Sequence, residues 1–355
     1  MIKKTVGIVF GGVSSEHNIS CISAKSIIQN IDLNKYNVIL IGITNQGKWF
    51  IFNDNIEMLP NDRWLTSASL VPAFISPDST VGGLVTSKGE IIKLDAVFPV
   101  LHGKNGEDGT IQGLLQMAQI PFVGCDSTSS GVCMDKSVAN AVADAFRIPQ
   151  AKWCAVTRYD YRKNGEAELN RAVEKLGFPI FVKPANAGSS VGITKAHNHD
   201  ELAKAMEIAF KEDKKAVLEE FIDGFEVECA VMGNNEPVAG EVGQILAAAE
   251  FYDFNSKYNN PQSRTVIPAN ISEEKRNEVK QQAIKAYKAL GCEGMSRCDF
   301  FVKKDSGEVL LNEINTIPGQ TAISMYPKLF EAAGISYRDL IDRLISLAFE
   351  RGGKI

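Results

Sequence analysis

Two acidic residues near the carboxyl-terminal end of this 355-residue chain have the spacing of a divalent-cation site. Residues 296–303 and 309–315 are predicted strands, and Asp305–Gly307 between them has glycine where a hairpin loop needs a left-handed residue. If the residues that flank this loop close the hairpin, Asp299 lies directly opposite Glu313.

The same pairing places Arg297 opposite Asn315 on the face that carries both acids, because side chains two positions apart on a strand share a face. Two carboxylates ~5 Å apart repel each other unless one is protonated or a cation lies between them. With an amide oxygen they form a site suited to Mg²⁺ that carries phosphates, and an arginine beside them binds anions bidentately. The alternative is a solvated hairpin face with an Arg–Glu ion pair, and a one-residue slip in register would separate the acids.

Two lysines and a glycine-rich loop indicate phosphate binding. The chain has no GxxxxGK[ST] sequence, which excludes a P-loop. Instead, Lys183 ends a predicted strand, and the small residues of 187–192 follow it, so that backbone N–H groups could close around phosphate oxygens. Lys136 begins a predicted helix and offers a further positive charge. An ordinary flexible hairpin turn is the alternative for this loop.

Two other glycine patterns belong to different enzyme classes, and both are incomplete. Gly188-x-Ser190-x-Gly192 has the spacing of a hydrolase nucleophile elbow, but a strand rather than a helix is predicted after it. Gly7-x-x-x-Gly11-Gly12 follows the first predicted strand, as in a dinucleotide-binding turn, but the full GxGxxG spacing is missing. An NAD-dependent oxidoreductase is therefore kept only as a competing hypothesis.

Residues 244–265 are predicted to form a long, mostly irregular lid. Loops of this length are usually functional or disordered, and Lys257 beside Tyr258 favours closure over a ligand. A partly ordered surface loop is the alternative. A second glycine-rich loop, 102–109, follows a predicted strand at the edge where parallel sheets bind ligands.

Three regions of different pattern must position these residues. The first alternates apolar runs with helical stretches, which is typical of a parallel α/β domain, and its section 44–95 is predicted to be less regular. The other two mix strands and helices in an α+β pattern. The predicted domains are 1–130, 131–215 and 216–355.

Composition excludes several classes of protein. The chain has 38 basic and 43 acidic residues, a net charge of −5 and no basic tract, which argues against a nucleic-acid binder. No apolar run approaches the ~18 residues of a membrane span. Seven cysteines without a CxxC pair favour free thiols in a reducing cytoplasm over disulfides or a zinc ribbon.

Taken together, these motifs resemble the D-alanine–D-alanine ligases of the ATP-grasp superfamily. The resemblance runs through VFGGVSSEHNIS, PVLHGKNGEDGTIQG, MDK, FVKPANAGSSVGITK, VLEEFIDGFEVECAV, FYDFNSKY, SRCDFF and LNEINTIPG, in that order along nearly the whole chain. It implies an amino-terminal Rossmann-like substrate domain and two α+β subdomains that sandwich ATP. It also implies ligation of two D-alanines through a D-alanyl phosphate for peptidoglycan precursors, in a cytoplasmic homodimer that contacts its partner through the first domain.

The resemblance assigns roles to individual residues. ATP phosphates would be bound by Lys136, Lys183 and Lys257, adenine by the hinge strand Glu219, Glu220, Phe221 and Ile222, and ribose by Glu226. Two Mg²⁺ ions, for which Mn²⁺ can substitute, would be bound by Asp299, Glu313 and Asn315. The catalytic residues would be Glu16 for the first substrate's ammonium, with His102 nearby, Ser189 and Tyr258 as its network partners, Arg297 and Gly319 as oxyanion donors, and Ser324 for the second carboxylate.

One departure from the family concerns the second substrate. Where the family often has Ser-His-Ser or Ser-Tyr-Ser, this chain has Ala322-Ile323-Ser324, which puts contacts made through the middle residue in doubt. Tyr252 and Met325 favour D-alanine, and the alternative is a D-alanine–D-serine ligase of the vancomycin-resistance type. A nucleotide-binding protein that has lost catalysis is a competing hypothesis from another class.

Overall fold

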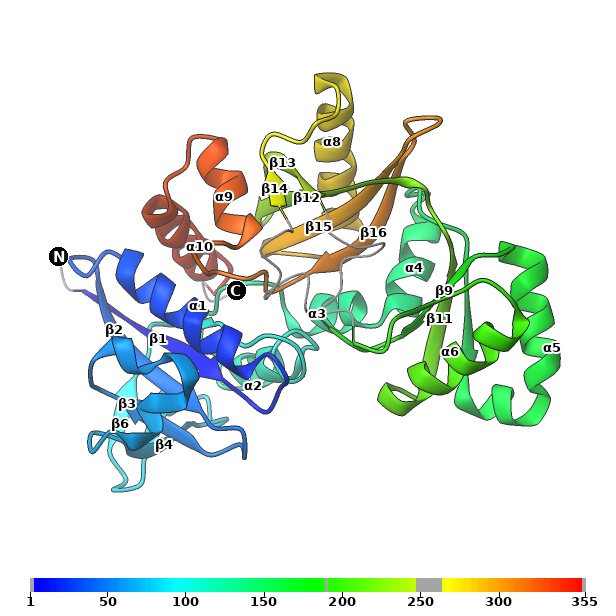
Figure 1. Cartoon of the computed structure of the whole chain (residues 1–355). Coiled ribbons are helices and arrows are strands. Elements are labelled where there is room, and N and C mark those ends of the chain that lie inside the picture. The colour runs from blue at the N-terminus through cyan, green and yellow to red at the C-terminus, as the bar shows by residue number, and fades with distance from the viewer. Residues whose placement is uncertain (1–2, 189–190, 247–263, 353–355) are drawn as a thin grey trace.

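The computed structural model describes residues 3–188, 191–246 and 264–352, which form three sheets covered by helices (Figure 1). The amino-terminal elements are β1 (Lys4–Gly11), α1 (His17–Asn30), β2 (Tyr36–Ile43), β3 (Trp49–Phe52), η1 (Ile56–Met58), η2 (Pro60–Thr66), β4 (Val71–Ile75), β5 (Gly83–Thr86), β6 (Ile91–Lys93), β7 (Ala96–Pro99), α2 (Thr110–Met117) and α3 (Ser127–Met134). Their strands form one sheet in the order β6-β5-β4-β3-β2-β1-β7. Strand β1 pairs in parallel with β2 and β7, whereas β3 to β6 extend the sheet in antiparallel order. The section 44–95 therefore adds short antiparallel strands to the sheet, with two 3-10 helices and turns between them.

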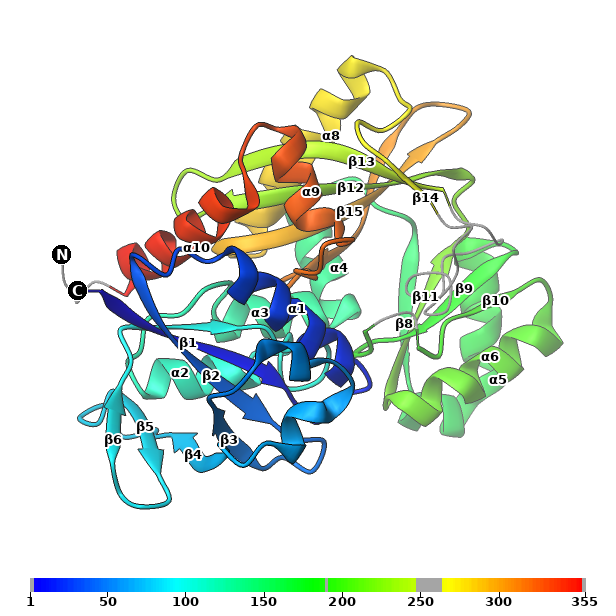
Figure 2. The same ribbon diagram turned by 60° about the vertical axis from the view of Figure 1, so that its left-hand side comes forward.

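Helices cover both faces of the parallel strands, which is why β1 is an almost continuous apolar run. Val6, Ile8 and Phe10 belong to the core that includes α1, and Val9 belongs to the core that includes α2. Figure 2 shows α1 and α2 on opposite sides of this sheet.

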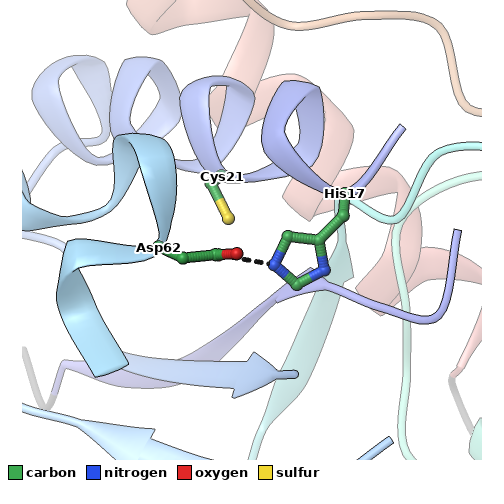
Figure 3. A group of neighbouring side chains, drawn as sticks. All are labelled: His17, Cys21 and Asp62. Carbon is green, nitrogen blue, oxygen red and sulfur yellow. Dashed lines mark hydrogen bonds and ion pairs between the residues drawn. The ribbon is translucent and has the colours of Figure 1, made fainter. Parts of the chain in front are cut away.

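The beginning of α1 is braced by His17 (Figure 3). Its Nδ1 donates to the carbonyl oxygen of Gly12 at 2.6 Å, and its Nε2 lies 2.7 Å from Asp62 Oδ1. Cys21 follows one helical turn later, and the ligand atoms of the three side chains lie within 4.8 Å of one another. Because both ring nitrogens of His17 have partners within the fold, this group holds the start of the helix, where Glu16 is the N-cap residue.

The central sheet consists of four antiparallel strands in the order β10-β9-β11-β8. The elements of this region are α4 (Lys136–Ala145), β8 (Trp153–Thr157), α5 (Arg158–Leu176), β9 (Ile180–Pro184), β10 (Thr194–Ala196), α6 (His199–Glu212) and β11 (Lys215–Glu220). A strand, β10, follows the Ala187–Gly192 loop, so the helix that a nucleophile elbow requires is absent at this described position. Strand β11 ends at Glu220, so Phe221 and Ile222, predicted to belong to the hinge strand, follow the strand instead.

The third sheet is antiparallel in the order β14-β13-β12-β15-β16. The elements here are β12 (Gly224–Gly233), β13 (Val238–Leu246), β14 (Arg264–Val266), α8 (Glu273–Ala289), β15 (Gly294–Lys303), β16 (Val309–Asn315), α9 (Met325–Ala332) and α10 (Tyr337–Arg351). Alternate residues of β12 belong to different cores: Cys229 and Val231 pack with α8, and Ala230 and Met232 with α9 and α10. This sheet is therefore also covered on both faces.

The predicted opposition of the two acids is confirmed, although the hairpin closes differently from the expectation. Asp299 pairs with Glu313 and Arg297 with Asn315. The hairpin closes on residues 303 and 308, where Lys303 N donates to Glu308 O at 3.0 Å, rather than on 304 and 308. A β-bulge restores the predicted register, because Phe300 pairs with residue 311 and leaves Asn312 as the extra residue.

The ends of the predicted lid are regular strand. Gln244 pairs with Val266 and Leu246 with Arg264, so β13 and β14 form an antiparallel ladder at the base of this segment. The prediction of irregular structure is wrong for these ends. Residues 247–263, which include Tyr252, Lys257 and Tyr258, lie outside the described residues.

Candidate active site

A cleft between the three sheets brings together most of the predicted site residues. Glu16 and His102 enter it from the amino-terminal region, Lys136 and Lys183 from the central region, and the acid pair from β15 and β16. The other predicted residues that line it are Glu226, Arg297, Asn315, Gly319 and Ser324. An adjoining cleft shares Lys183 and Glu226 and is lined by Glu219, Glu220, Phe221 and Ile222. Residues from distant parts of the chain thus meet in one continuous site.

The floor of the cleft carries the donor set of a divalent cation. Asp299 and Glu313 face the cleft from paired strands, and Asn315 lies on the same face. Arg297 binds Asp299 with two bonds, Nε to Oδ1 at 2.7 Å and Nη2 to Oδ2 at 2.6 Å, while Lys136 Nζ lies 3.7 Å from Glu313 Oε2. Two carboxylates and an amide oxygen fit Mg²⁺, which prefers oxygen ligands and is usually bound together with phosphates.

Lys183 is the buried positive charge at the junction of the two clefts. Its Nζ lies 2.6 Å from Glu219 Oε2 and 3.2 Å from Asn312 Oδ1. Burial lowers the pKa of Lys183, but the nearby Glu219 carboxylate outweighs burial and raises the pKa above the ordinary lysine value. The ammonium group is therefore charged at neutral pH and is suited to bind phosphate.

Glu219→Gln is expected to make nucleotide binding sensitive to alkaline pH. A raised lysine pKa means that the ion pair stabilises the protein below the ordinary lysine pKa, and that this stabilisation is lost as the pH rises through the raised value. Without Glu219 the burial of Lys183 persists, so its pKa falls and it loses its proton at lower pH. ATP affinity measured across the alkaline range should decline earlier in the variant. Glu168→Gln, which removes an exposed ion pair with Arg171, should leave this profile unchanged, and identical profiles for Glu219→Gln and the unaltered protein would refute the expectation.

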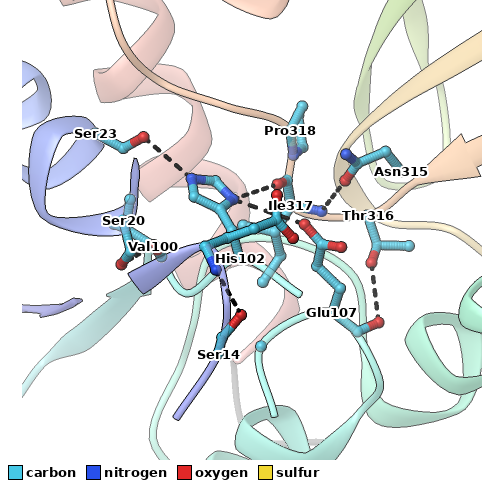
Figure 4. A network of polar contacts seen from close by, with 12 residues as sticks. Ser14, Ser20, Ser23, Val100, His102, Glu107, Asn315, Thr316, Ile317 and Pro318 are labelled. Carbon is cyan, nitrogen blue, oxygen red and sulfur yellow. Dashed lines mark hydrogen bonds and ion pairs between the residues drawn. The ribbon is translucent and has the colours of Figure 1, made fainter. Parts of the chain in front are cut away.

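A polar network joins the amino-terminal loop to the loop after β16 (Figure 4). His102 Nδ1 donates to Ile317 O at 3.1 Å, and its Nε2 contacts Ser23 Oγ at 3.1 Å. Glu107 Oε1 lies 3.7 Å from His102 Nδ1. The network fixes the segment that leads to Gly319, whose backbone N–H is the predicted oxyanion donor.

Ser324, at the far end of the same loop, is the N-cap residue of α9. Its Oγ accepts a hydrogen bond from Thr321 N at 3.0 Å and lies 2.8 Å from Thr321 Oγ1. A Cβ atom at position 319 would lie 2.7 Å from Ser324 Oγ, so a larger residue there would displace the Ser324 side chain. The loop thus packs the predicted oxyanion donor tightly against the residue predicted for the second carboxylate.

The structure also adds residues to the predicted site. Glu228 and Asn312 line the cleft but were missed by sequence analysis. The alternation of Glu226 and Glu228 with apolar residues on β12 could have revealed the first, whereas the bulge at Asn312 has no sequence signal. Three predicted residues, Ser189, Lys257 and Tyr258, lie outside the described residues.

Comparisons with known proteins agree over the length of the chain. The family model described as D-ala D-ala ligase N-terminus matches residues 5–125, and the one described as D-ala D-ala ligase C-terminus matches residues 142–346. A D-alanine–D-alanine ligase of Acetivibrio thermocellus is 47% identical, with 98% of this chain and 96% of that protein covered. One of Clostridium novyi is also 47% identical, with 99% of this chain and 100% of that protein covered.

Solved structures of this family are also similar to the chain. Among the described residues, no helix combines the length and the apolar composition of a membrane span. The VanG D-Ala:D-Ser ligase of Enterococcus faecalis superposes with a TM-score of 0.91 at 41% identity, covering 98% of this chain and 100% of that one. The D-alanine–D-alanine ligase of Coxiella burnetii superposes with a TM-score of 0.86 at 36% identity, covering 99% and 96%.

Proposed function

The chain belongs to the D-alanine–D-alanine ligase family of ATP-dependent ligases with the ATP-grasp fold, and we propose that it joins two molecules of D-alanine through a D-alanyl phosphate. The observation that carries this proposal is the cleft in which two lysines face two opposed carboxylates beside a buried arginine. The product is a precursor of peptidoglycan. The enzyme would act in the cytoplasm as a homodimer that associates through its first domain.

The first step is transfer of the γ-phosphate of ATP to the carboxylate of the first D-alanine, which forms an acyl phosphate and ADP. Lys136 and Lys183 would bind the phosphates and neutralise charge on the transferring group, and Glu16 would bind the ammonium of D-alanine. Asp299, Glu313 and Asn315 would hold two Mg²⁺ ions, or Mn²⁺ in their place, which supply charge neutralisation at the phosphoryl group.

The second step is attack by the amine of the other D-alanine on the acyl carbon, followed by loss of phosphate from a tetrahedral intermediate. Arg297 and the Gly319 N–H would stabilise the oxyanion, a contact worth ~3 kcal/mol for each donor. Ser324 would bind the incoming carboxylate. Ser189, Lys257 and Tyr258 would complete the closed site and exclude water, which hydrolyses acyl phosphates.

Adenine and ribose would occupy the adjoining cleft. Glu219, Glu220, Phe221 and Ile222 line the side expected to meet adenine, and Glu226, at the junction with the first cleft, would bind ribose hydroxyls. The phosphates would then lie toward Lys183, which lines both clefts.

The closing experiment measures phosphate release and dipeptide formation with ATP, Mg²⁺ and D-alanine. We expect one phosphate for each dipeptide formed. Tight ATP binding without phosphate release would instead identify a binding protein that has lost catalysis, and binding of a nicotinamide cofactor would favour the oxidoreductase hypothesis.

A second candidate, ligation of D-alanine to D-serine, is favoured by the similarity to VanG. Met325 lines the cleft beside Ser324 and offers only an apolar surface to a hydroxymethyl group. We therefore expect D-alanine to be the better second substrate in parallel assays with D-serine and D-lactate. A higher kcat/KM with D-serine would reverse this assignment.

A further inference from the structure

Arg297 is held by two buried carboxylates rather than one. Glu228 on β12 pairs directly with Asp299 on β15, and Arg297 Nε lies 3.2 Å from Glu228 Oε2 as well as 2.7 Å from Asp299 Oδ1. The exposed fractions of Arg297, Asp299 and Glu228 are 6%, 3% and 2%. Both carboxylates are thus close enough to compensate the same guanidinium in a region with little access to water.

The electrostatics of Arg297 depend on both acids. Burial lowers the pKa of the Arg297 guanidinium, but the charges of Asp299 and then Glu228 outweigh burial and raise the pKa well above its ordinary value. A guanidinium has five N–H donors in a rigid planar fork. Two of these donors bind Asp299, and the Glu228 carboxylate lies beside Nε as a second counter-ion.

Asp299 has two roles that compete with each other, as a proposed ligand of Mg²⁺ and as a counter-ion of Arg297. Asp299 is a proposed Mg²⁺ ligand, yet both of its oxygens accept hydrogen bonds from Arg297. A carboxylate that neutralises an arginine attracts a cation less strongly, and an arginine that loses its only counter-ion in a buried site would be costly. A second acid beside Arg297 removes this conflict.

We propose that Glu228 is a positioning residue that keeps Arg297 in place in the cleft while Asp299 binds Mg²⁺ with the nucleotide. This inference rests on the proposed function. In this role Glu228 acts through Arg297. It keeps the oxyanion donor oriented throughout the reaction and leaves Asp299 available to the cation.

Glu228→Gln tests this role, because it preserves the shape of the side chain and removes the charge. In the variant Glu228 no longer carries a charge, so Asp299 alone of the two neutralises Arg297 and binds it more strongly. The Mg²⁺ concentration that half-saturates ADP binding, measured by calorimetry, should rise about tenfold, a size typical of the coupling between neighbouring charged residues. The kcat for dipeptide formation should fall by about tenfold or more, with the KM for D-alanine nearly unchanged.

Two further variants separate this role from a structural one. Glu241→Gln removes an acid from the neighbouring strand β13, where it pairs with Lys280 at 3.0 Å, and should match the unaltered protein in Mg²⁺ dependence. Glu228→Asp keeps the charge and should retain more Mg²⁺ affinity than Glu228→Gln, which also provides a test if the glutamine variant fails to fold.

Two outcomes would overturn the inference. The first is unaltered Mg²⁺ dependence and kcat in Glu228→Gln. The second is a lower melting temperature in a variant that still binds Mg²⁺ and ADP normally. Failure of the proposed function is distinct, because the unaltered protein would then release no phosphate with D-alanine.

Discussion

Replacing Glu313 by glutamine is expected to lower the rate of dipeptide formation at least about a thousandfold, because a divalent cation contributes several kcal/mol to phosphoryl transfer and each 1.4 kcal/mol is about tenfold. Glu313 lies opposite Asp299, and an amide in its place binds Mg²⁺ weakly. The loss should appear both in steady-state turnover and in Mg²⁺-dependent ADP binding.

The same hairpin supplies the control for this variant. Glu308 pairs with Lys303 near the hairpin loop, where its side chain is 49% exposed. Exposed ion pairs contribute ~0–1 kcal/mol, so Glu308→Gln should preserve both turnover and the free energy of unfolding. Normal turnover of Glu313→Gln at ordinary Mg²⁺ concentrations would show that the metal assignment is wrong.

The second large effect is expected for Arg297→Lys. Lysine keeps the positive charge between Glu228 and Asp299 but replaces a planar fork with a single ammonium. Loss of one oxyanion donor typically costs about 10²–10³ in kcat, so kcat should fall by this factor while the KM for D-alanine changes little.

The pattern of the kinetic change decides whether Arg297 acts in the transition state. A raised KM with an unchanged kcat would mean that it binds the ground state and transition state equally. Arg297→Met is the contrasting variant, since it leaves two buried acids uncompensated and should lower the free energy of unfolding by ~3–5 kcal/mol. This loss can be measured by denaturant unfolding.

The acid pair on the hairpin could be predicted because strand periodicity is local. The two-residue period that places Arg297 and Asp299 on one face depends only on neighbouring residues. The predicted opposition to Glu313 was correct even though the loop closes one residue earlier, since the bulge at Asn312 shifts the register back. That bulge depends on contacts with other elements and was not predictable.

Motif types, their order and strand alternation in the sequence by themselves determined the family resemblance. They also determined which lysines we propose to bind phosphate and which strand face we propose to bind metal. Only the tertiary structure revealed that Lys183 pairs with Glu219, that His102 reaches Ile317, and that Glu228 shares Arg297 with Asp299. The physical reason is the distance along the chain over which each effect acts. Backbone periodicity depends on a few neighbouring residues, whereas the partners of buried charges and imidazoles depend on which distant segments pack together.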